Sequence, residues 1–96
     1  MSLQSEVETL AGELGLRVRA ARVRRGWTAR DLAAKLGVSD RTARKLEKGE
    51  TSVAFGTALT ACVILDVDFA SELSRHAARK RARPRAPEIA ASETDF

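Results

Sequence analysis

The sequence predicts an all-α fold, a domain of five short helices followed by a flexible C-terminal tail, on three observations. Its 96 residues suffice for one small domain and not for two. The apolar residues are mostly Leu, Val, Ile and Ala, with 4% aromatics, as in a compact helical core. Apolar residues also recur every three or four positions between glycines, a spacing typical of amphipathic helices.

The first predicted helix covers Leu10 to Arg25, and Gly26 ends it. Four apolar residues form its inward stripe: Leu10, Leu14, Val18 and Ala21. The acidic segment "SEVET" upstream is predicted to add one turn capped by Ser5. Glycines at positions 12 and 15 weaken helical continuity between the two parts.

The next two predicted helices are short and carry clear end signals. Thr28 and Asp31 form a capping-box-like start for the second helix, and Gly37 ends it. Ser39 is the predicted N-cap of the third helix, and Gly49 is its stop. The three residues "GVS" that join them have the spacing of a helix-turn-helix.

The fourth predicted helix runs from about Val53 to Leu65, after a loop in which Thr51 and Ser52 supply capping hydroxyls. It carries no charged residue. A helix that is apolar all round is either buried or faces a partner, and this domain has little interior. We therefore expect a subunit interface on this helix.

The fifth predicted helix, "DFASELSRHAARKRAR", turns Phe69, Leu73 and Ala77 inward. The prolines and small polar residues after Arg83 predict a tail, in which Phe96 is either incidental or an anchor to a partner.

The predicted domain organisation has three parts. It consists of an N-terminal extension at residues 1–12, a helical domain at residues 13–80 and a tail at residues 81–96 that is first basic and then acidic.

Several classes of function are disfavoured. No apolar run reaches the roughly 18 residues of a membrane span, and the N-terminus lacks a signal-peptide pattern. Cys62 has neither a disulfide partner nor metal-binding neighbours, which fits a reducing compartment. We expect a cytoplasmic protein with no metal and no cofactor. His76 stands alone beside arginines as a surface residue, so an enzyme is not expected.

Charge is clustered along the chain. The net charge is +4. Residues 16–50 hold eleven Lys and Arg against four Asp and Glu, whereas residues 1–15 hold three acids and no base. A second basic block covers residues 75–85. Such clustering indicates contact with a polyanion, although solvated helix faces are the simpler alternative.

The third predicted helix divides into two faces. At about 100° per residue, three cations fall within roughly 60° of Arg41 and form one basic stripe with it: Arg44, Lys45 and Lys48. Ala43, Leu46 and Glu47 project from the opposite side. A buried, unpaired carboxylate costs several kcal/mol, so Glu47 requires a cation on the inner side.

The stretch "LGLRVRAARVRRGWTARDLAAKLGVSDRTARKLEKGE" resembles the Cro/phage-repressor (Xre-type) helix-turn-helix proteins, and the resemblance covers about residues 13–73. Ala33, Gly37 and the "LEKG" ending at Gly49 stand in the family's register. The resemblance implies a lambda-repressor-like fold. It also implies that Arg22, near the end of the first helix, is the cation that pairs with Glu47.

The resemblance further implies that the third helix enters the DNA major groove and reads base edges with Asp40, Arg41 and Lys45. Arg41 and Lys45 suit guanine, and Asp40 suits cytosine, although Asp40 equally suits the helix dipole. Further residues suit phosphates, with solvated surface as an equal alternative for each: Thr28, Arg30, Thr42, Arg44, Lys48, Thr51 and Ser52.

Three residues depart from the family's pattern. Ala29 replaces a phosphate-binding glutamine, so that contact shifts to Arg30 or is lost. Ala43 replaces a branched residue and leaves a core space that Trp27 is expected to fill. Asp66 replaces a glycine after the fourth helix and is expected in the left-handed conformation.

We therefore expect a dimeric repressor that binds a palindromic operator in double-stranded DNA, often in its own promoter. The chain is also similar to HipB-like antitoxins, which bind a kinase-type toxin as well as DNA. In a third alternative, the block "RHAARKRARPR" is an RNA-binding or nonspecific arm.

Overall fold

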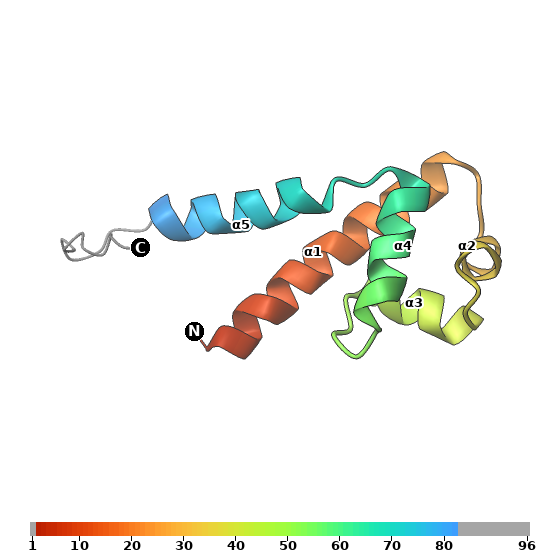
Figure 1. The fold of residues 1–96 in the computed structure, drawn as a ribbon, viewed down its shortest axis with the longest axis horizontal. Coiled ribbons are helices and arrows are strands. Elements are labelled where there is room, and N and C mark those ends of the chain that lie inside the picture. The colour runs from red at the N-terminus through yellow and green to blue at the C-terminus, as the bar shows by residue number, and fades with distance from the viewer. Residues whose placement is uncertain (1, 83–96) are drawn as a thin grey trace.

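The computed structural model describes residues 2–82, which form five helices and no strand (Figure 1). The predicted all-α fold with five helices is confirmed. The helices are α1 (Leu3–Arg24), α2 (Ala29–Leu36), α3 (Asp40–Lys48), α4 (Phe55–Leu65) and α5 (Phe69–Ala82). The body measures 50 × 22 × 21 Å, because α1 and α5 reach out from the other three helices.

The first helix is longer than predicted, because α1 is a single helix of 22 residues that begins at Leu3. Its N-cap is Ser2, whose hydroxyl accepts a hydrogen bond from the Ser5 amide at 3.1 Å. The predicted start at Leu10 and the predicted cap at Ser5 are therefore wrong. The predicted stop at Gly26 is confirmed, with a φ of 75° at that residue.

Gly12 and Gly15 do not interrupt α1, because they form its contact with the end of α3. A Cβ atom on Gly15 would lie 2.5 Å from the Glu47 carbonyl oxygen, and one on Gly49 would lie 2.4 Å from the Gly12 Cα. The two backbones therefore touch, and only glycine fits at positions 15 and 49. Gly15, which appeared to weaken the helix, instead allows α3 to pack against it, whereas a Cβ on Gly12 would meet nothing within 4 Å.

The end signals of α2 and α3 are confirmed. Thr28 and Asp31 form a complete capping box, with the Asp31 carboxylate accepting from the Thr28 amide at 2.8 Å. This bond and the one to the Thr28 hydroxyl hold the pKa of Asp31 below its usual value. Ser39 caps α3, and Gly37 and Gly49 end the two helices in the left-handed conformation.

The capping hydroxyls predicted for the fourth helix are not used. α4 begins at Phe55, and its N-cap, Ala54, makes no side-chain capping bond. Thr51 and Ser52 lie in a turn that precedes the helix by several residues, too far back to reach its first amides. At the other end, Asp66 adopts the expected left-handed conformation, with a φ of 58°.

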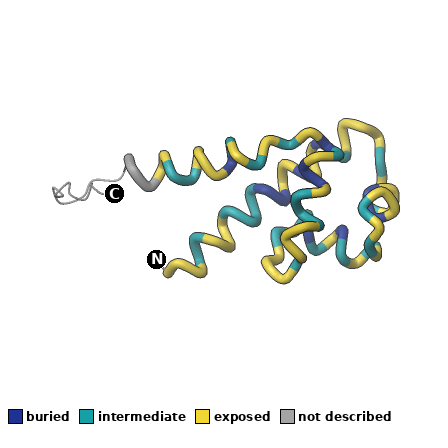
Figure 2. Tube along the Cα trace, viewed as in Figure 1, coloured by how far each residue is buried: buried dark blue, intermediate teal, exposed yellow. Residues whose placement is uncertain are grey.

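A small aliphatic core lies where α1, α2, α3 and α4 meet (Figure 2). It consists of Val18, Ala21, Leu32, Leu46, Ala61 and Leu65. Trp27 is half-buried and packs against this core. Cys62 is a buried free thiol, and burial raises its pKa.

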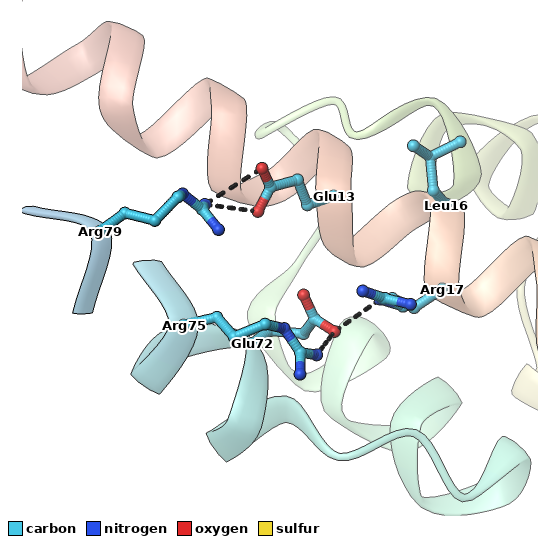
Figure 3. Close-up of a pocket in the computed structure, with 6 residues that line it drawn as sticks. All are labelled: Glu13, Leu16, Arg17, Glu72, Arg75 and Arg79. Atoms are coloured by element: carbon cyan, nitrogen blue, oxygen red, sulfur yellow. Dashed lines mark hydrogen bonds and ion pairs between the residues drawn. The ribbon is translucent and has the colours of Figure 1, made fainter. Parts of the chain in front are cut away.

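The fifth helix packs on α1 through ion pairs (Figure 3) as well as through part of the predicted apolar stripe, because Phe69 and Ala77 are half-buried. Glu72 is only 3% exposed and pairs with Arg17 of α1 at 2.8 Å and with Arg75. Arg79 donates to Glu13 at 2.9 Å. Leu73 is 43% exposed, so its predicted inward position is wrong. Two arginines neutralise this buried carboxylate.

Candidate nucleic-acid interface

The α3 helix is held so that one face is buried and the other is open. Ala43 and Leu46 are buried, whereas Arg41, Arg44 and Lys48 are exposed. α3 has packing contacts with α1 on one side and α2 on the other. The division into an inner apolar face and an outer cationic face, predicted from the helical wheel, is therefore present in the structure.

The structure brings Arg22 and Glu47 together beneath this surface. The Arg22 Nε donates to Glu47 Oε2 at 2.5 Å, and Arg22 Nη2 donates to Glu47 Oε1 at 3.1 Å. Their side chains are 13% and 9% exposed. The third guanidinium nitrogen, Nη1, donates to the Trp27 carbonyl oxygen at 2.7 Å. One side chain of α1 thus connects α3 to the segment that leads into α2.

The cations of α3 surround a shallow hollow of about 290 Å³. It is lined by Arg41, Arg44, Lys45, Lys48 and Glu50. Lys45 is half-buried, whereas Arg41, Arg44 and Lys48 are exposed. Concentrated positive charge around an open concave surface attracts a polyanion such as a nucleic-acid backbone. The structure thus places Arg41 and Lys45 beside the two cations predicted to bind phosphates.

Asp40 lies at the first turn of α3 and faces α2. Its carboxylate is 3.9 Å from the Arg30 Nε, and the Arg30 side chain is 84% exposed. The sequence predicted that Asp40 contacts a base and that Arg30 contacts a phosphate, but not that the two side chains lie close together. Both residues occupy first turns of helices joined by a short turn, but whether they meet depends on the angle between those helices. The Asp40 carboxylate therefore approaches Arg30 of the same chain, whereas reading a base would require it to extend toward DNA.

The predicted phosphate-binding hydroxyls lie at the edges of this surface. The Thr28 hydroxyl accepts from the Asp31 amide at 3.0 Å and also hydrogen-bonds to the Asp31 carboxylate. The Thr42 hydroxyl accepts a hydrogen bond from the Ser39 hydroxyl at 3.1 Å. Thr51 and Ser52 are exposed in the turn after α3. All four predicted hydroxyl residues are thus accessible at least in part, and Thr51 and Ser52 are free of the capping role predicted for them.

Trp27 forms a junction that the sequence did not reveal. The Lys35 Nζ lies 4.5 Å from the centre of its ring, and the Arg25 Cζ lies 5.6 Å from it. Cations at these distances from an aromatic face are attracted to it. Arg25 also donates to the Leu65 carbonyl oxygen at 3.0 Å, at the end of α4. These contacts join the end of α1 to α2 through the Trp27 ring and to α4 through the Leu65 carbonyl.

Two arginines of the second basic block have described side chains, and both pair with carboxylates, one of them on α1. Arg75 and Arg79 pair with Glu72 and Glu13, as described above. His76 is not a simple surface residue, because its side chain is 21% exposed and its Nε2 lies 3.9 Å from Glu6. The predicted tail, including Phe96, lies outside the described residues.

Other kinds of site find no support in the described part of the chain. Among residues 2–82, no cluster of His, Cys, Asp and Glu has the arrangement of a metal site. No helix there has the length and hydrophobicity needed to cross a membrane.

Comparison with known proteins agrees with this geometry. A family model described as helix-turn-helix matches residues 18–71, more than half of the chain and all of α2, α3 and α4. The search of curated proteins and the search of solved structures each returned no match.

Proposed function

The chain belongs to the Xre-type helix-turn-helix family of DNA-binding transcriptional regulators, and on this premise we propose that it is a homodimeric repressor of a palindromic operator. The family is not an enzyme family. In this proposal, α3 enters the major groove of double-stranded DNA and two copies read the two halves of the site. Repression follows when the bound dimer covers a promoter, including its own.

The observation that carries the proposal is the cationic outer face of α3, held by the Arg22–Glu47 pair beneath it. Arg41 is exposed at the start of α3 and has no acidic partner within 4.0 Å among the described residues. Its guanidinium is therefore available for a bidentate contact with guanine O6 and N7. Lys45, one turn further, supplies a second donor to a base edge.

Asp40 has a positioning role in this proposal. Its approach to Arg30 favours an orientation of the Arg30 guanidinium, which then contacts a phosphate at the start of the site. Arg44 and Lys48 contact phosphates on either side of the groove, and Thr28, Thr42, Thr51 and Ser52 donate hydrogen bonds to the backbone. These contacts set the register of α3 without reading sequence.

The test compares Arg41→Ala with Arg44→Ala on the preferred duplex and on random duplex. Arg41→Ala is expected to cost about 1–3 kcal/mol on the preferred duplex and little on random DNA. Arg44→Ala is expected to weaken binding to both duplexes alike. Arg24→Ala is the matched control, since it removes an exposed arginine of α1 away from the α3 hollow. Equal losses on both duplexes for Arg41→Ala would refute the base-reading role.

A second candidate function is that of an antitoxin that also binds a kinase-type toxin. The observation that favours a protein partner is the exposure of Leu16 and Val23 on α1, at 64% and 56%. Co-purification with a kinase whose gene lies next to the gene for this chain would support the antitoxin function. If deletion of residues 84–96 removed the toxin contact, the contact would lie in the tail. If Leu16→Glu removed it instead, the contact would lie on α1.

A further inference from the structure

The outer side of α1 carries an apolar stripe that the other described helices leave exposed. Leu16, Ala20 and Val23 follow one another at helical spacing, and all three are exposed. At about 100° per residue they lie within roughly 60° of one another, on the side of α1 opposite the buried Val18. Leu16 is 64% exposed and Val23 is 56% exposed. Two exposed large apolar side chains on one stripe indicate a contact surface.

Arginines flank this apolar stripe on both sides. Arg19 lies along one edge, Arg17 and Arg24 lie along the other, and all three are exposed. Among the described residues, Arg19 and Arg24 form no ion pair with an acidic side chain. Residues 16–24 contain no Asp or Glu. We call this surface the arginine-flanked stripe, and it consists of Leu16, Arg17, Arg19, Ala20, Val23 and Arg24.

A hollow beside the stripe carries one positive charge in excess. It has a volume of about 360 Å³ and is lined by Glu13, Leu16, Arg17, Glu72, Arg75 and Arg79. Arg79 is neutralised by Glu13, whereas Arg17 and Arg75 share the single carboxylate of Glu72 (Figure 3). The side chains of Arg17 and Arg75 are 57% and 50% exposed, so their guanidinium groups can still donate hydrogen bonds to a further carboxylate.

We propose that the arginine-flanked stripe is the docking site for an acidic amphipathic helix of a partner protein. The apolar side chains of that helix cover Leu16 and Val23, and its carboxylates meet the flanking arginines. Leu16 and Val23 lie about 10 Å apart along α1, which suits two turns of a second helix packed against it. The inference goes beyond DNA binding, and it rests on the second candidate function only in that both require a protein partner.

Charge complementarity selects an acidic protein segment over the other occupants. A second copy of this chain would place the same three arginines against the stripe, and like charges repel. Double-stranded DNA would satisfy the arginines but gain little from Leu16 and Val23, because its contacts are made through phosphates and base edges. A helix that lies in a membrane surface inserts a face rich in Trp, Phe and Leu, whereas this stripe contains no aromatic residue.

The test measures binding of a fluorescent synthetic peptide to the full chain by fluorescence anisotropy. The peptide is about 15 residues long, with leucines at i, i+4 and i+7 and glutamates on both sides of them. A second peptide has lysine in place of every glutamate. The acidic peptide is expected to bind at least about tenfold more tightly than the lysine peptide, because only its charges complement the arginines.

Two substitutions with the same charge change locate the contact. Leu16→Glu is expected to raise the dissociation constant of the acidic peptide about tenfold or more, because it places a carboxylate among the apolar and acidic side chains of the peptide. Val63→Glu is the matched control on α4 and is expected to raise it less than about twofold. Leu16 and Val63 are 64% and 81% exposed, so both replacements leave the fold intact, as circular dichroism will verify.

Several results would overturn the docking site. These are no binding of the acidic peptide, equal effects of Leu16→Glu and Val63→Glu, displacement of the peptide by excess random duplex, and much tighter peptide binding after removal of residues 83–96, which would make the tail the occupant. Binding to phosphatidylserine vesicles that Leu16→Glu abolishes would identify a membrane surface as the occupant instead.

Arg24→Ala and Arg41→Ala separate this inference from the proposed function. Arg24→Ala is expected to weaken peptide binding about threefold or more and to leave operator binding unchanged, and Arg41→Ala is expected to do the reverse. A chain that binds the peptide as expected but prefers no DNA sequence would leave the docking site standing and refute the repressor function. A chain that binds the peptide and co-purifies with no kinase would retain the docking site and count against the antitoxin function.

Discussion

Glu47 lies between Leu46 and Lys48 in the sequence, yet its carboxylate contacts Arg22, 25 residues earlier in the chain. The pair is largely shielded from water, and Arg22 also bonds to the Trp27 carbonyl oxygen. Removing one partner of a buried ion pair destabilises a fold, because the other charge is left buried without a counter-charge. At the scale of one residue, Glu47 therefore acts on stability, while the cations on the opposite side of α3 are the proposed DNA contacts.

Glu47→Ala is expected to lower the free energy of unfolding by about 3–5 kcal/mol, because Arg22 loses its counter-charge inside the fold. The measurement is urea unfolding followed by the fluorescence of Trp27, the single tryptophan of the chain. Trp27 suits this purpose because its carbonyl oxygen bonds to Arg22.

Glu50→Ala provides the control, as it removes an exposed carboxylate three residues away. It is expected to change the unfolding free energy by less than about 0.5 kcal/mol. If Glu47→Ala left stability unchanged while abolishing DNA binding, the division between a structural inner face and a DNA-binding outer face would be wrong.

Asp31 links the stability of α2 to pH. Hydrogen bonds from Thr28 lower the pKa of Asp31, so the folded state favours the ionised carboxylate over the protonated one. The stabilisation is complete above the ordinary pKa of 3.8 and is lost as the pH falls through the lower, folded value. We expect the loss of stability below about pH 4 to be shallower in Asp31→Ala than in wild type. Unfolding curves between pH 5 and pH 2.5, at about half-unit steps, will check this. Identical slopes would contradict it.

At the scale of helices, the contact between α1 and α3 depends on backbone proximity. Gly15→Ala is expected to destabilise the fold, since its Cβ would lie 2.5 Å from a carbonyl oxygen of α3. Gly12→Ala is the matched control on the same helix, because a Cβ there meets nothing within 4 Å. It is expected to stabilise the fold by up to about 1 kcal/mol through helix propensity. Thermal unfolding of the two variants will show opposite shifts if the contact is as tight as described, and equal shifts if it is not.

The helix ends could be predicted from the sequence because caps are local. Thr28 with Asp31, Ser39 and the glycines at 26, 37 and 49 act within one turn of where they stand. The inward stripe of α1 was also predictable from its apolar spacing, because Leu14, Val18 and Ala21 are buried as that spacing requires.

The errors arose where a distant element decides the outcome. In the sequence, Gly12 and Gly15 appear to weaken α1, but in the structure the end of α3 packs against the backbone of both glycines. Leu73 read as an inward residue, but Arg17 and Arg75 make burial of Glu72 favourable instead. The proximity of Arg30 and Asp40 likewise depends on the angle between α2 and α3, which no local pattern specifies. Charge patterning located the candidate DNA surface, but not these contacts between helices.

At the scale of the whole molecule, the positive charge falls into two regions of different character. The cations of α3 surround an open hollow, whereas Arg75 and Arg79 of α5 are paired with carboxylates. Only unpaired cations release counterions when they bind DNA. Of these two groups of described cations, the one on α3 should therefore contribute more to the salt dependence of binding.

Lys48→Ala is expected to reduce the slope of log K against log salt concentration by about one unit on any duplex. Arg79→Ala is the control with the same charge change, and it is expected to leave the slope nearly unchanged because Glu13 already neutralises Arg79. Titrations of a fluorescent duplex between about 50 and 200 mM salt will measure both slopes. The reverse order would favour the alternative in which the basic block of α5 is a nonspecific arm.

The most direct test of the central claim is in-vitro selection of DNA from a random pool by the full chain. Two copies that read DNA with α3 should select a palindrome whose half-sites are centred one helical turn, about 10 base pairs, apart. The same selection with Arg41→Ala should lose the preference at one position of each half-site, since the exposed Arg41 is the proposed base reader of α3. A wild-type pool with no consensus after repeated rounds would contradict sequence-specific reading by this helix.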